Sequence, residues 1–269
     1  MQYHDISSNP FRRGLLTCTI VFSLLLMLCA PGCSGGGGGN SGSSADNNDH
    51  IDNNDPVENY DEIREYEGQS LSSINDFREN SISGTQNVDK DTYELKITGL
   101  VDKPTAYSYD YILENFDSHT EVLSLHCVEG WSVKLLWEGV LVSDVVQEAE
   151  PLAGATTVIF YAYDGYSTSF PIEYVSRHNA ILAYKMNDVI LPPERGFPFQ
   201  FVAEDKWGYK WCKWVTEIEF TGNEGYLGYW ESRGYPNDAS LTDCSPGPVS
   251  AQPAGHPDRA DCCSCHGAD

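Results

Sequence analysis

Basic residues are scarce in this sequence. Its 269 residues contain 16 lysines and arginines against 40 aspartates and glutamates, which gives a formal net charge of −24. A chain with this charge repels nucleic acid and anionic lipid surfaces, so we expect no nucleic-acid partner. Most of the acidic residues are expected to form a solvated surface, and the charge by itself defines no site. No internal repeat is visible, and the length suits one domain with tails.

Cysteine is missing where a disulfide framework would need it. Seven of the nine cysteines lie near the ends of the chain: Cys18, Cys29, Cys33, Cys244, Cys262, Cys263 and Cys265. Only Cys127 and Cys212 lie in the stretch that can build a core, which leaves too few pairs for a disulfide scaffold. Cys127 is therefore a free thiol, a partner of Cys212, or a ligand.

The sequence also lacks a long membrane-spanning run. Its apolar stretch near the N-terminus ends at Leu28 and is short for a span. Because Arg12 and Arg13 precede it, it reads as an export signal. The paired arginines resemble a twin-arginine signal, and a Sec signal is the alternative. Residues 30–33 resemble a lipobox, with alanine in place of leucine, so residues 1–33 are predicted to be a signal peptide with Cys33 lipidated.

Composition divides the remaining chain into three parts. Residues 34–58 are rich in Gly, Ser, Asn and Asp and predict a flexible linker. Residues 59–237 are expected to form the folded domain. Residues 238–269 are rich in Pro, Gly, Ser and Asp and predict a disordered tail. A lipid on Cys33 would anchor the domain to a membrane in the periplasm or at the cell surface.

Hydrophobic periodicity predicts a strand-rich domain with short helices. Strands are expected at residues 93–98, 157–163, 166–170, 180–184, 199–203 and 214–220. Short helices are expected after Ser108, over residues 140–146 and from Ile172, and residues 61–77 predict an irregular arm with a helical piece. This order favours a mixed α+β fold over a doubly wound parallel sheet.

The chain is organised around residues 125–132, which place Cys127 between an apolar run and a glycine. The apolar run predicts a strand end, and Gly130 allows a sharp turn. The thiol is then expected on a short loop at the mouth of a sheet, where reactive and metal-binding groups are common.

Four blocks of residues carry a likeness to a known family. They are residues 126–132 with 137–139, residues 182–187, residues 191–198 and residues 207–215. In order and spacing the chain resembles the molybdopterin-binding domain of the sulfite oxidase family across residues 60–235, closest to the bacterial periplasmic protein-methionine-sulfoxide reductase catalytic subunit branch. The resemblance implies a molybdenum-molybdopterin cofactor with Cys127 as the metal ligand. A thiolate is a soft donor that suits such a metal, and a buried core cysteine is the alternative.

The resemblance also implies which residues hold the pterin: Asn80, Arg195, Gln200, Lys210, Trp211, Cys212 and Lys213, besides Cys127. Lys210 and Lys213 flank exposed amides that would hold its phosphate, with Cys212 contributing its backbone. Arg195 stands where the family often has His or Asn, and Gln200 where it often has Arg. This departure moves the cation by five residues, and surface positions are the alternative for both.

The residues after Cys127 bear on the substrate. True sulfite oxidases have an arginine-rich run there, whereas this chain has the acidic Glu129. An anionic substrate would be repelled, so we expect a small-molecule or protein-bound oxo substrate of the sulfoxide or N-oxide type. A sulfite oxidase-like dehydrogenase is the alternative. His126 either donates a proton or only binds nearby backbone. We expect a monomer that exchanges electrons with a membrane cytochrome or quinone-linked partner.

The tail carries one further motif. Cys262, Cys265 and His266 fit the C-x-x-C-H pattern of covalent haem c attachment. A haem would serve as an electron relay beside molybdenum. An adventitious metal site, disulfides within the tail and a truncated end are the alternatives.

Two other classes of function compete with this reading. One is a thiol enzyme with Cys127 as nucleophile, but the adjacent His126 would point the other way on a strand. The second is a binding lipoprotein that keeps the fold without the cofactor.

Overall fold

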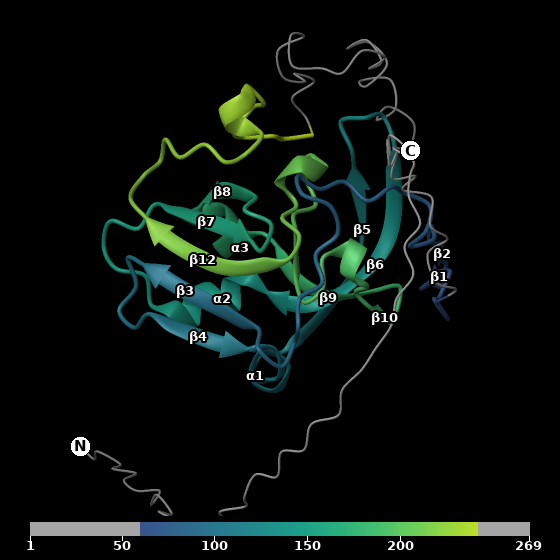
Figure 1. Cartoon of the computed structure of the whole chain (residues 1–269), viewed down its shortest axis with the longest axis horizontal. Coiled ribbons are helices and arrows are strands. Elements are labelled where there is room, and N and C mark those ends of the chain that lie inside the picture. The colour runs from purple at the N-terminus through teal and green to yellow at the C-terminus, as the bar shows by residue number, and fades with distance from the viewer. Residues whose placement is uncertain (1–59, 242–269) are drawn as a thin grey trace, which may run out of the picture. The chain divides into compact units, whose positions relative to one another are not determined.

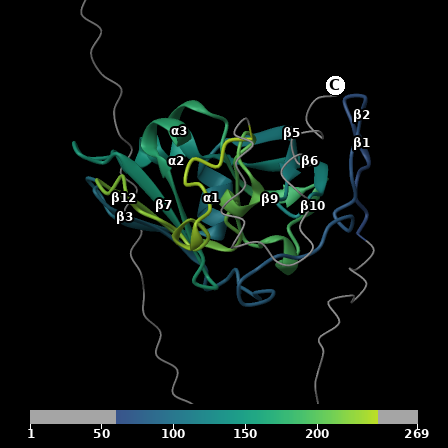
Figure 2. The same ribbon diagram turned by 90° about the horizontal axis from the view of Figure 1, so that it is seen from above.

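The computed structural model describes residues 60–241, and two five-stranded sheets dominate them. The two sheets lie side by side in both views of Figures 1 and 2. The first has the order β10-β9-β6-β5, with β11 also paired to β9, and the second has the order β4-β3-β12-β7-β8. Short helices connect the strands. This mixture confirms the expected strand-rich α+β fold.

The first sheet carries the Cys127 loop. Its strands are β5 (Ser118–His126), β6 (Ser132–Leu141), β9 (Ile181–Met186), β10 (Val189–Ile190) and β11 (Gln200–Val202). β5 and β6 form a long antiparallel hairpin, which sequence periodicity did not predict for β6. The helix expected over residues 140–146 begins only at Val142, because Leu141 still pairs with Ile181 of β9.

The second sheet is mixed. Its strands are β3 (Glu94–Gly99), β4 (Thr105–Ser108), β7 (Thr157–Ala162), β8 (Ser167–Pro171) and β12 (Val215–Thr221). β12 lies in the middle of the sheet, parallel to β3 and antiparallel to β7. Because β12 is the last long strand, the sheet joins residues from both ends of the domain.

The helices are short and close the gaps between strands. They are α1 (Tyr109–Asn115), α2 (Val142–Ala149), α3 (Ile172–Arg177), η1 (Pro193–Arg195), η2 (Gly208–Lys210) and η3 (Glu231–Arg233). Ser108 caps α1 as predicted, since its hydroxyl accepts a hydrogen bond of 3.2 Å from the Tyr111 amide. No helix within residues 60–241 has the length and apolarity needed to cross a bilayer.

The residues before β3 form an extended arm, and the helical piece predicted there is wrong. The arm instead contains the two-residue strands β1 (Glu65–Tyr66) and β2 (Gln69–Ser70), at the outer edge of the first sheet in both views. The Glu62 carboxylate fixes it by accepting hydrogen bonds of 2.9 Å from the Ile74 amide and the Asn187 side chain. Hydrogen bonding, rather than an apolar helical face, therefore orders this segment.

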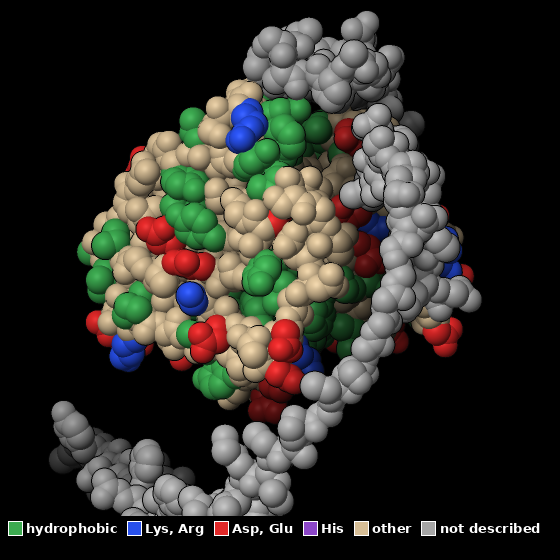
Figure 3. Space-filling model, viewed as in Figure 1, with side chains coloured by type: hydrophobic (Ala, Val, Ile, Leu, Met, Phe, Trp, Pro, Cys, Tyr) green, Lys and Arg blue, Asp and Glu red, His purple; other side chains and the backbone are tan. Residues whose placement is uncertain are grey.

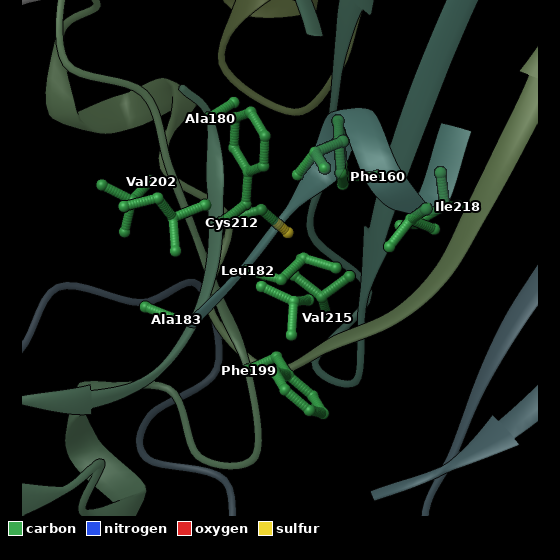
Figure 4. Packing of buried hydrophobic residues seen from close by; sticks show 14 of the residues in the cluster. Phe160, Ala180, Leu182, Ala183, Phe199, Val202, Cys212, Val215 and Ile218 are labelled. Atoms are coloured by element: carbon green, nitrogen blue, oxygen red, sulfur yellow. The ribbon is translucent and has the colours of Figure 1, made fainter. Parts of the chain in front are cut away.

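Aromatic and aliphatic side chains fill the core, and Cys212 is one of them. Figure 4 shows its sulfur among hydrocarbon side chains such as Leu182 and Val215. Cys127 and Cys212 are both free thiols, so the disulfide alternative is wrong. On the face in Figure 3, acidic side chains are scattered and basic ones are few. The predicted signal, the linker, Cys33, Cys262, Cys265 and His266 lie outside the described residues.

Candidate active site

Cys127 lies in the tight turn between β5 and β6. Its amide donates a 2.9 Å hydrogen bond to the Trp131 carbonyl, and the Gly130 amide donates one of 3.1 Å back to the Cys127 carbonyl. Gly130 has φ +85°, which glycine adopts without strain. His126 is the last paired residue of β5, opposite Ser132. The structure thus places the half-buried thiol on a short loop at a strand end, as the sequence predicts.

Polar groups surround the thiol on one side. The Asn80 amide nitrogen lies 3.8 Å from the Cys127 sulfur and 3.4 Å from a Glu129 carboxylate oxygen. That oxygen also accepts a hydrogen bond of 3.2 Å from the Trp131 indole and one of 3.5 Å from Arg78. Asn80 therefore links the sulfur to a carboxylate that three donors hold in place.

The electrostatics of the thiol do not favour an activated nucleophile. Burial, with a smaller contribution from the Glu129 carboxylate, raises the pKa of Cys127 to about 11. An activated cysteine nucleophile needs the opposite shift. A bound metal cation, in contrast, deprotonates a thiol outright. The thiol-enzyme alternative therefore has no electrostatic support.

Arg195 is buried beneath the arm. Only 3% of it is exposed, and its guanidinium donates to the main-chain carbonyls of Ile74 at 3.0 Å and Phe77 at 2.7 Å. The guanidinium also lies 4.0 Å from the centre of the Phe77 ring. Burial lowers its pKa. The alternative that Arg195 is a surface residue is therefore wrong, and Gln200, only 5% exposed, is no surface residue either.

The turn over residues 208–213 packs directly on the Cys127 strand. A Cβ at Gly208 would lie 2.9 Å from Leu125 Cδ1 and 3.1 Å from the His126 carbonyl oxygen, so the turn approaches this strand closely at Gly208. No residue in the described part of the chain accepts a hydrogen bond from the amides of Cys212 or Lys213. Two amides with no acceptor among residues 60–241 therefore lie beside the loop that carries the thiol.

The Lys213 side chain adds a cation close to these two amides. A Cβ at Gly196 would lie 3.0 Å from Lys213 Cβ and 3.2 Å from Gln200 Cβ, so these three residues are packed together. The Lys213 ammonium lies 2.5 Å from Glu79, next to Asn80 in the arm. Burial lowers the pKa of Lys213, and Glu79 partly offsets the shift. The arm thus brings Asn80, Arg195 and Lys213 to one place.

Lys210 and Trp211 have other partners. The Lys210 ammonium is fully buried and lies 2.7 Å from a Glu231 carboxylate oxygen, 2.7 Å from the Ser169 carbonyl and 3.0 Å from the Asn237 side-chain oxygen. The Trp211 indole donates a 3.0 Å hydrogen bond to the Lys206 carbonyl. The structure therefore does not bring the Lys210 side chain together with the other predicted pterin residues.

Comparison with protein families now identifies the domain. A family model described as "Oxidoreductase molybdopterin binding domain" matches residues 82–230. The chain belongs to this family. It is an oxidoreductase whose domain implies a molybdenum cofactor, which confirms the resemblance seen in the sequence.

Similar proteins place the chain within the molybdopterin oxidoreductases. It is 34% identical to "Uncharacterized oxidoreductase YuiH" of Bacillus subtilis, over 55% of this chain and 74% of that protein. It is 27% identical to the "Protein-methionine-sulfoxide reductase catalytic subunit MsrP" of Xanthomonas campestris, over 48% of this chain and 44% of that protein. Among solved structures it resembles the sulfane dehydrogenase SoxCD of Paracoccus pantotrophus, with a TM-score of 0.50 and 25% identity over 52% of this chain and 41% of that chain. The chain thus spans less than half of MsrP and SoxCD.

The donors at this site fit a molybdopterin. The Cys127 sulfur would supply a soft ligand, which suits the metal. The amides of Cys212 and Lys213, with the Lys213 ammonium, suit a phosphate, because consecutive N–H groups and a cation favour an anion. These groups lie on loops that Gly208 packs together.

The sequence analysis did not predict two kinds of residue near the site: the acidic partners of the two lysines, and an aromatic residue after β12. Glu79 pairs with Lys213, and Glu231 pairs with Lys210, although each pair is far apart in the chain. Tyr235 was also missed, although its ring packs on Tyr209 in the turn. The one available signal was the acidic Glu231 within an aromatic, glycine-rich stretch.

Proposed function

We propose that this molybdopterin oxidoreductase removes oxygen from uncharged sulfoxides or N-oxides rather than oxidising sulfite. The observation that supports this direction is the charge beside Cys127. Glu129 stands there as a carboxylate held by Asn80, Trp131 and Arg78. Arg78 only balances that carboxylate, so an approaching dianion meets no surplus positive charge from this cluster.

The buried cations support the same view. Lys210 is paired with Glu231, and Lys213 with Glu79. Arg195 donates to carbonyls beneath the arm. Releasing Lys210 or Arg195 to bind an anionic substrate would leave a buried partner unpaired, which costs several kcal/mol.

Each residue has a defined part in this proposal. Cys127 ligates the metal, the amides of Cys212 and Lys213 bind the pterin phosphate, and Asn80 orients the region around the sulfur. Arg195, Gln200 and Lys213 shape the pterin pocket. The bound cofactor supplies two-electron oxygen-atom chemistry: sulfoxide, two electrons and two protons become sulfide and water. His126, at the end of β5, remains the candidate proton donor.

The cellular setting is part of the same proposal. We infer export through the predicted signal, a lipid on Cys33 and a periplasmic or cell-surface position. Electrons would come from a membrane cytochrome or quinone-linked partner. A haem on Cys262, Cys265 and His266 is a separate prediction. A haem stain of the denatured full-length chain, co-expressed with haem-maturation proteins, tests it, and an unstained band contradicts it.

Metal analysis and a substrate panel test the function. Protein from a molybdenum-replete host should contain about one molybdenum per chain, and Cys127→Ser should lose it. Cys212→Ser is the matched control, because its thiol lies in the core and the metal should stay. The loaded wild type, with a reduced dye, should reduce sulfoxides and N-oxides. A metal-replete Cys127→Ser protein contradicts the ligand assignment, and oxidation of sulfite without reduction of sulfoxides favours the dehydrogenase.

A further inference from the structure

The last part of the arm, residues 78–92, is a loop with two fixed ends, and we call it the arm tip. It contains no helix or strand and leads to β3 (Figure 1). Before it, the Phe77 carbonyl accepts a 2.7 Å hydrogen bond from the buried Arg195. After it, the hydroxyl of the buried Tyr93 donates one of 2.6 Å to the Val215 carbonyl. Any movement of the arm tip is therefore confined between these two points.

The contacts of the arm tip lie near the surface. None of its residues is buried, and Val88 packs against the core from a half-buried position. Arg78 and Asn80 donate to the Glu129 carboxylate at 3.5 and 3.4 Å, and both contacts are exposed. A segment with few buried apolar contacts and exposed hydrogen bonds opens at a lower free energy than the whole domain unfolds. The arm tip can therefore open while the two sheets stay folded.

One ion pair joins the arm tip to the turn that carries the proposed phosphate-binding amides. The Glu79 carboxylate lies 2.5 Å from the Lys213 ammonium. The same ammonium donates to the Glu194 carbonyl at 3.4 Å and lies 4.3 Å from the centre of the Trp214 ring. Because an ammonium has only three N–H donors, these partners leave Lys213 little capacity for a further anion.

A phosphate on this turn would compete with Glu79. The amides of Cys212 and Lys213 lie on the same turn and have no acceptor among residues 60–241. An anion bound by these amides and by the Lys213 ammonium would lie close to the Glu79 carboxylate, and like charges at short range repel each other. The charge of Asp164, which also acts on Lys213, adds to the repulsion. The Glu79 side chain is partly exposed, so it can turn into solvent once it is displaced.

We propose that the arm tip is a gate for cofactor loading and that Glu79 is its latch. Glu79 releases Lys213 to the phosphate of the entering pterin, and the freed arm tip moves aside. Arg78 and Asn80 then return to Glu129 and close the arm tip beside Cys127. The inference rests on the assignment of the pterin phosphate to Lys213 in the proposed function, and it adds a route of entry to that assignment.

Hydrogen exchange of the arm tip, followed by mass spectrometry, tests the latch. The full chain, purified from a host that makes no pterin, is compared with and without inorganic phosphate, and chloride at equal ionic strength is the salt control. In Glu79→Gln the arm tip should exchange about fivefold faster than in the wild type, because a partly exposed ion pair is lost. Phosphate should speed this exchange in the wild type but not in Glu79→Gln. Lys213→Met should exchange like Glu79→Gln, with or without phosphate.

Phosphate binding and cofactor uptake test the gate. The Kd of inorganic phosphate should be about fivefold lower in Glu79→Gln than in the wild type, because the competing carboxylate is gone. Lys213→Met should raise it about tenfold, because a charge-assisted contact is lost. Molybdenum-molybdopterin supplied in vitro should enter Glu79→Gln several times faster, measured as molybdenum bound per chain over time. Glu65→Gln, at an exposed carboxylate on β1 of the same arm, is the matched control and should behave like the wild type throughout.

Two results would overturn the proposal. An arm tip that exchanges at the same rate in Glu79→Gln and the wild type, or that phosphate fails to speed in the wild type, contradicts the latch. Equal rates of cofactor uptake in Glu79→Gln and the wild type contradict the gate. If exchange and uptake respond as expected but the loaded enzyme reduces no sulfoxide, the proposed substrate is refuted and the gate stands.

Discussion

The arm before β3 and residues 226–240, which we call the C-terminal strap, are both attached to the turn over residues 208–213, but the ion pairs that attach them differ in burial. Each is an irregular segment that a glutamate fixes to the turn over residues 208–213. Glu79 of the arm pairs with Lys213, and their side chains are 22% and 14% exposed. Glu231 of the strap pairs with Lys210, and neither side chain is exposed. Two lysines three positions apart thus hold opposite ends of the domain.

The difference in burial between the two ion pairs predicts different roles for them. A fully buried pair has no room to exchange its partner, because an unpaired charge in the core is very unfavourable. A partly exposed pair with free amides beside it can accept an anion at little cost. We therefore expect the Lys210 pair to govern stability and the Lys213 pair to govern cofactor retention.

The largest effect should come from breaking the buried pair. Glu231→Ala leaves the Lys210 ammonium without its carboxylate and should lower the free energy of unfolding by about 3–5 kcal/mol. Thermal denaturation should show a Tm lower by about 10 °C. The double variant Lys210→Met/Glu231→Leu should be more stable than Glu231→Ala, since an apolar pair leaves no charge uncompensated. A Tm within a degree or two of the wild type for Glu231→Ala would show that the pair does not anchor the strap.

Lys213→Met should have the opposite profile. Because the pair with Glu79 is partly exposed, the free energy of unfolding should fall by only about 1 kcal/mol. Molybdenum per purified chain should fall severalfold, since a charge-assisted contact to the phosphate is lost. Lys103→Met, at an exposed pair with Glu150, is the control and should keep its metal. Full metal occupancy in Lys213→Met would remove this lysine from the cofactor site.

A variant of Asn80 tests the part of the arm that lies close to the Cys127 sulfur. Asn80→Ala should change the free energy of unfolding by less than about 0.5 kcal/mol, because the side chain is exposed. The absorption and paramagnetic resonance spectra of the loaded protein should nevertheless shift, because the Asn80 amide lies 3.8 Å from the sulfur of Cys127, the proposed metal ligand. Asn75→Ala, at an exposed arm residue, should leave the spectra unchanged. Identical spectra for Asn80→Ala and the wild type would contradict a role at the sulfur.

A further effect concerns the base of the arm and depends on pH. Burial alone would raise the pKa of Glu62, but hydrogen bonds from Ser73, Asn187 and Ile74 outweigh it and lower the pKa. Its contribution to stability is therefore complete above the unfolded pKa of about 4.3 and is lost as pH falls through the lower folded value.

The variant Glu62→Gln isolates this contribution. It should be less stable than the wild type by about 1 kcal/mol at pH 6, and the gap should close below about pH 4. Glu114→Gln, at an exposed position on α1, is the control. Denaturant titrations at several pH values measure both, and a gap that persists or widens in acid would contradict the assignment.

Local signals in the sequence predicted the centre of the site. The apolar run before Cys127 and the turn at Gly130 depend only on neighbouring residues, so the thiol on its loop was predictable. Ser108 at the start of α1 was predictable for the same reason. The remaining pterin assignments came from the resemblance, and they stay predictions.

The partners of the charged residues could not be predicted in this way. Arg195 can be buried because carbonyls more than a hundred positions earlier accept hydrogen bonds from its guanidinium. The resemblance implied Lys210 as a phosphate ligand, and its buried partner Glu231 comes close to it only in the folded chain. β6 was missed because Trp137 and Gly139 read as a motif rather than as part of a long strand. Contacts distant in sequence determine each of these outcomes.

The central position of β12 has a consequence for biosynthesis. While the ribosome has yet to release residue 221, β3 and β7 each present an unpaired backbone edge, because the strand that lies between them does not exist. Such edges invite pairing with other nascent chains. The second sheet can therefore close only after translation of nearly all of the described domain.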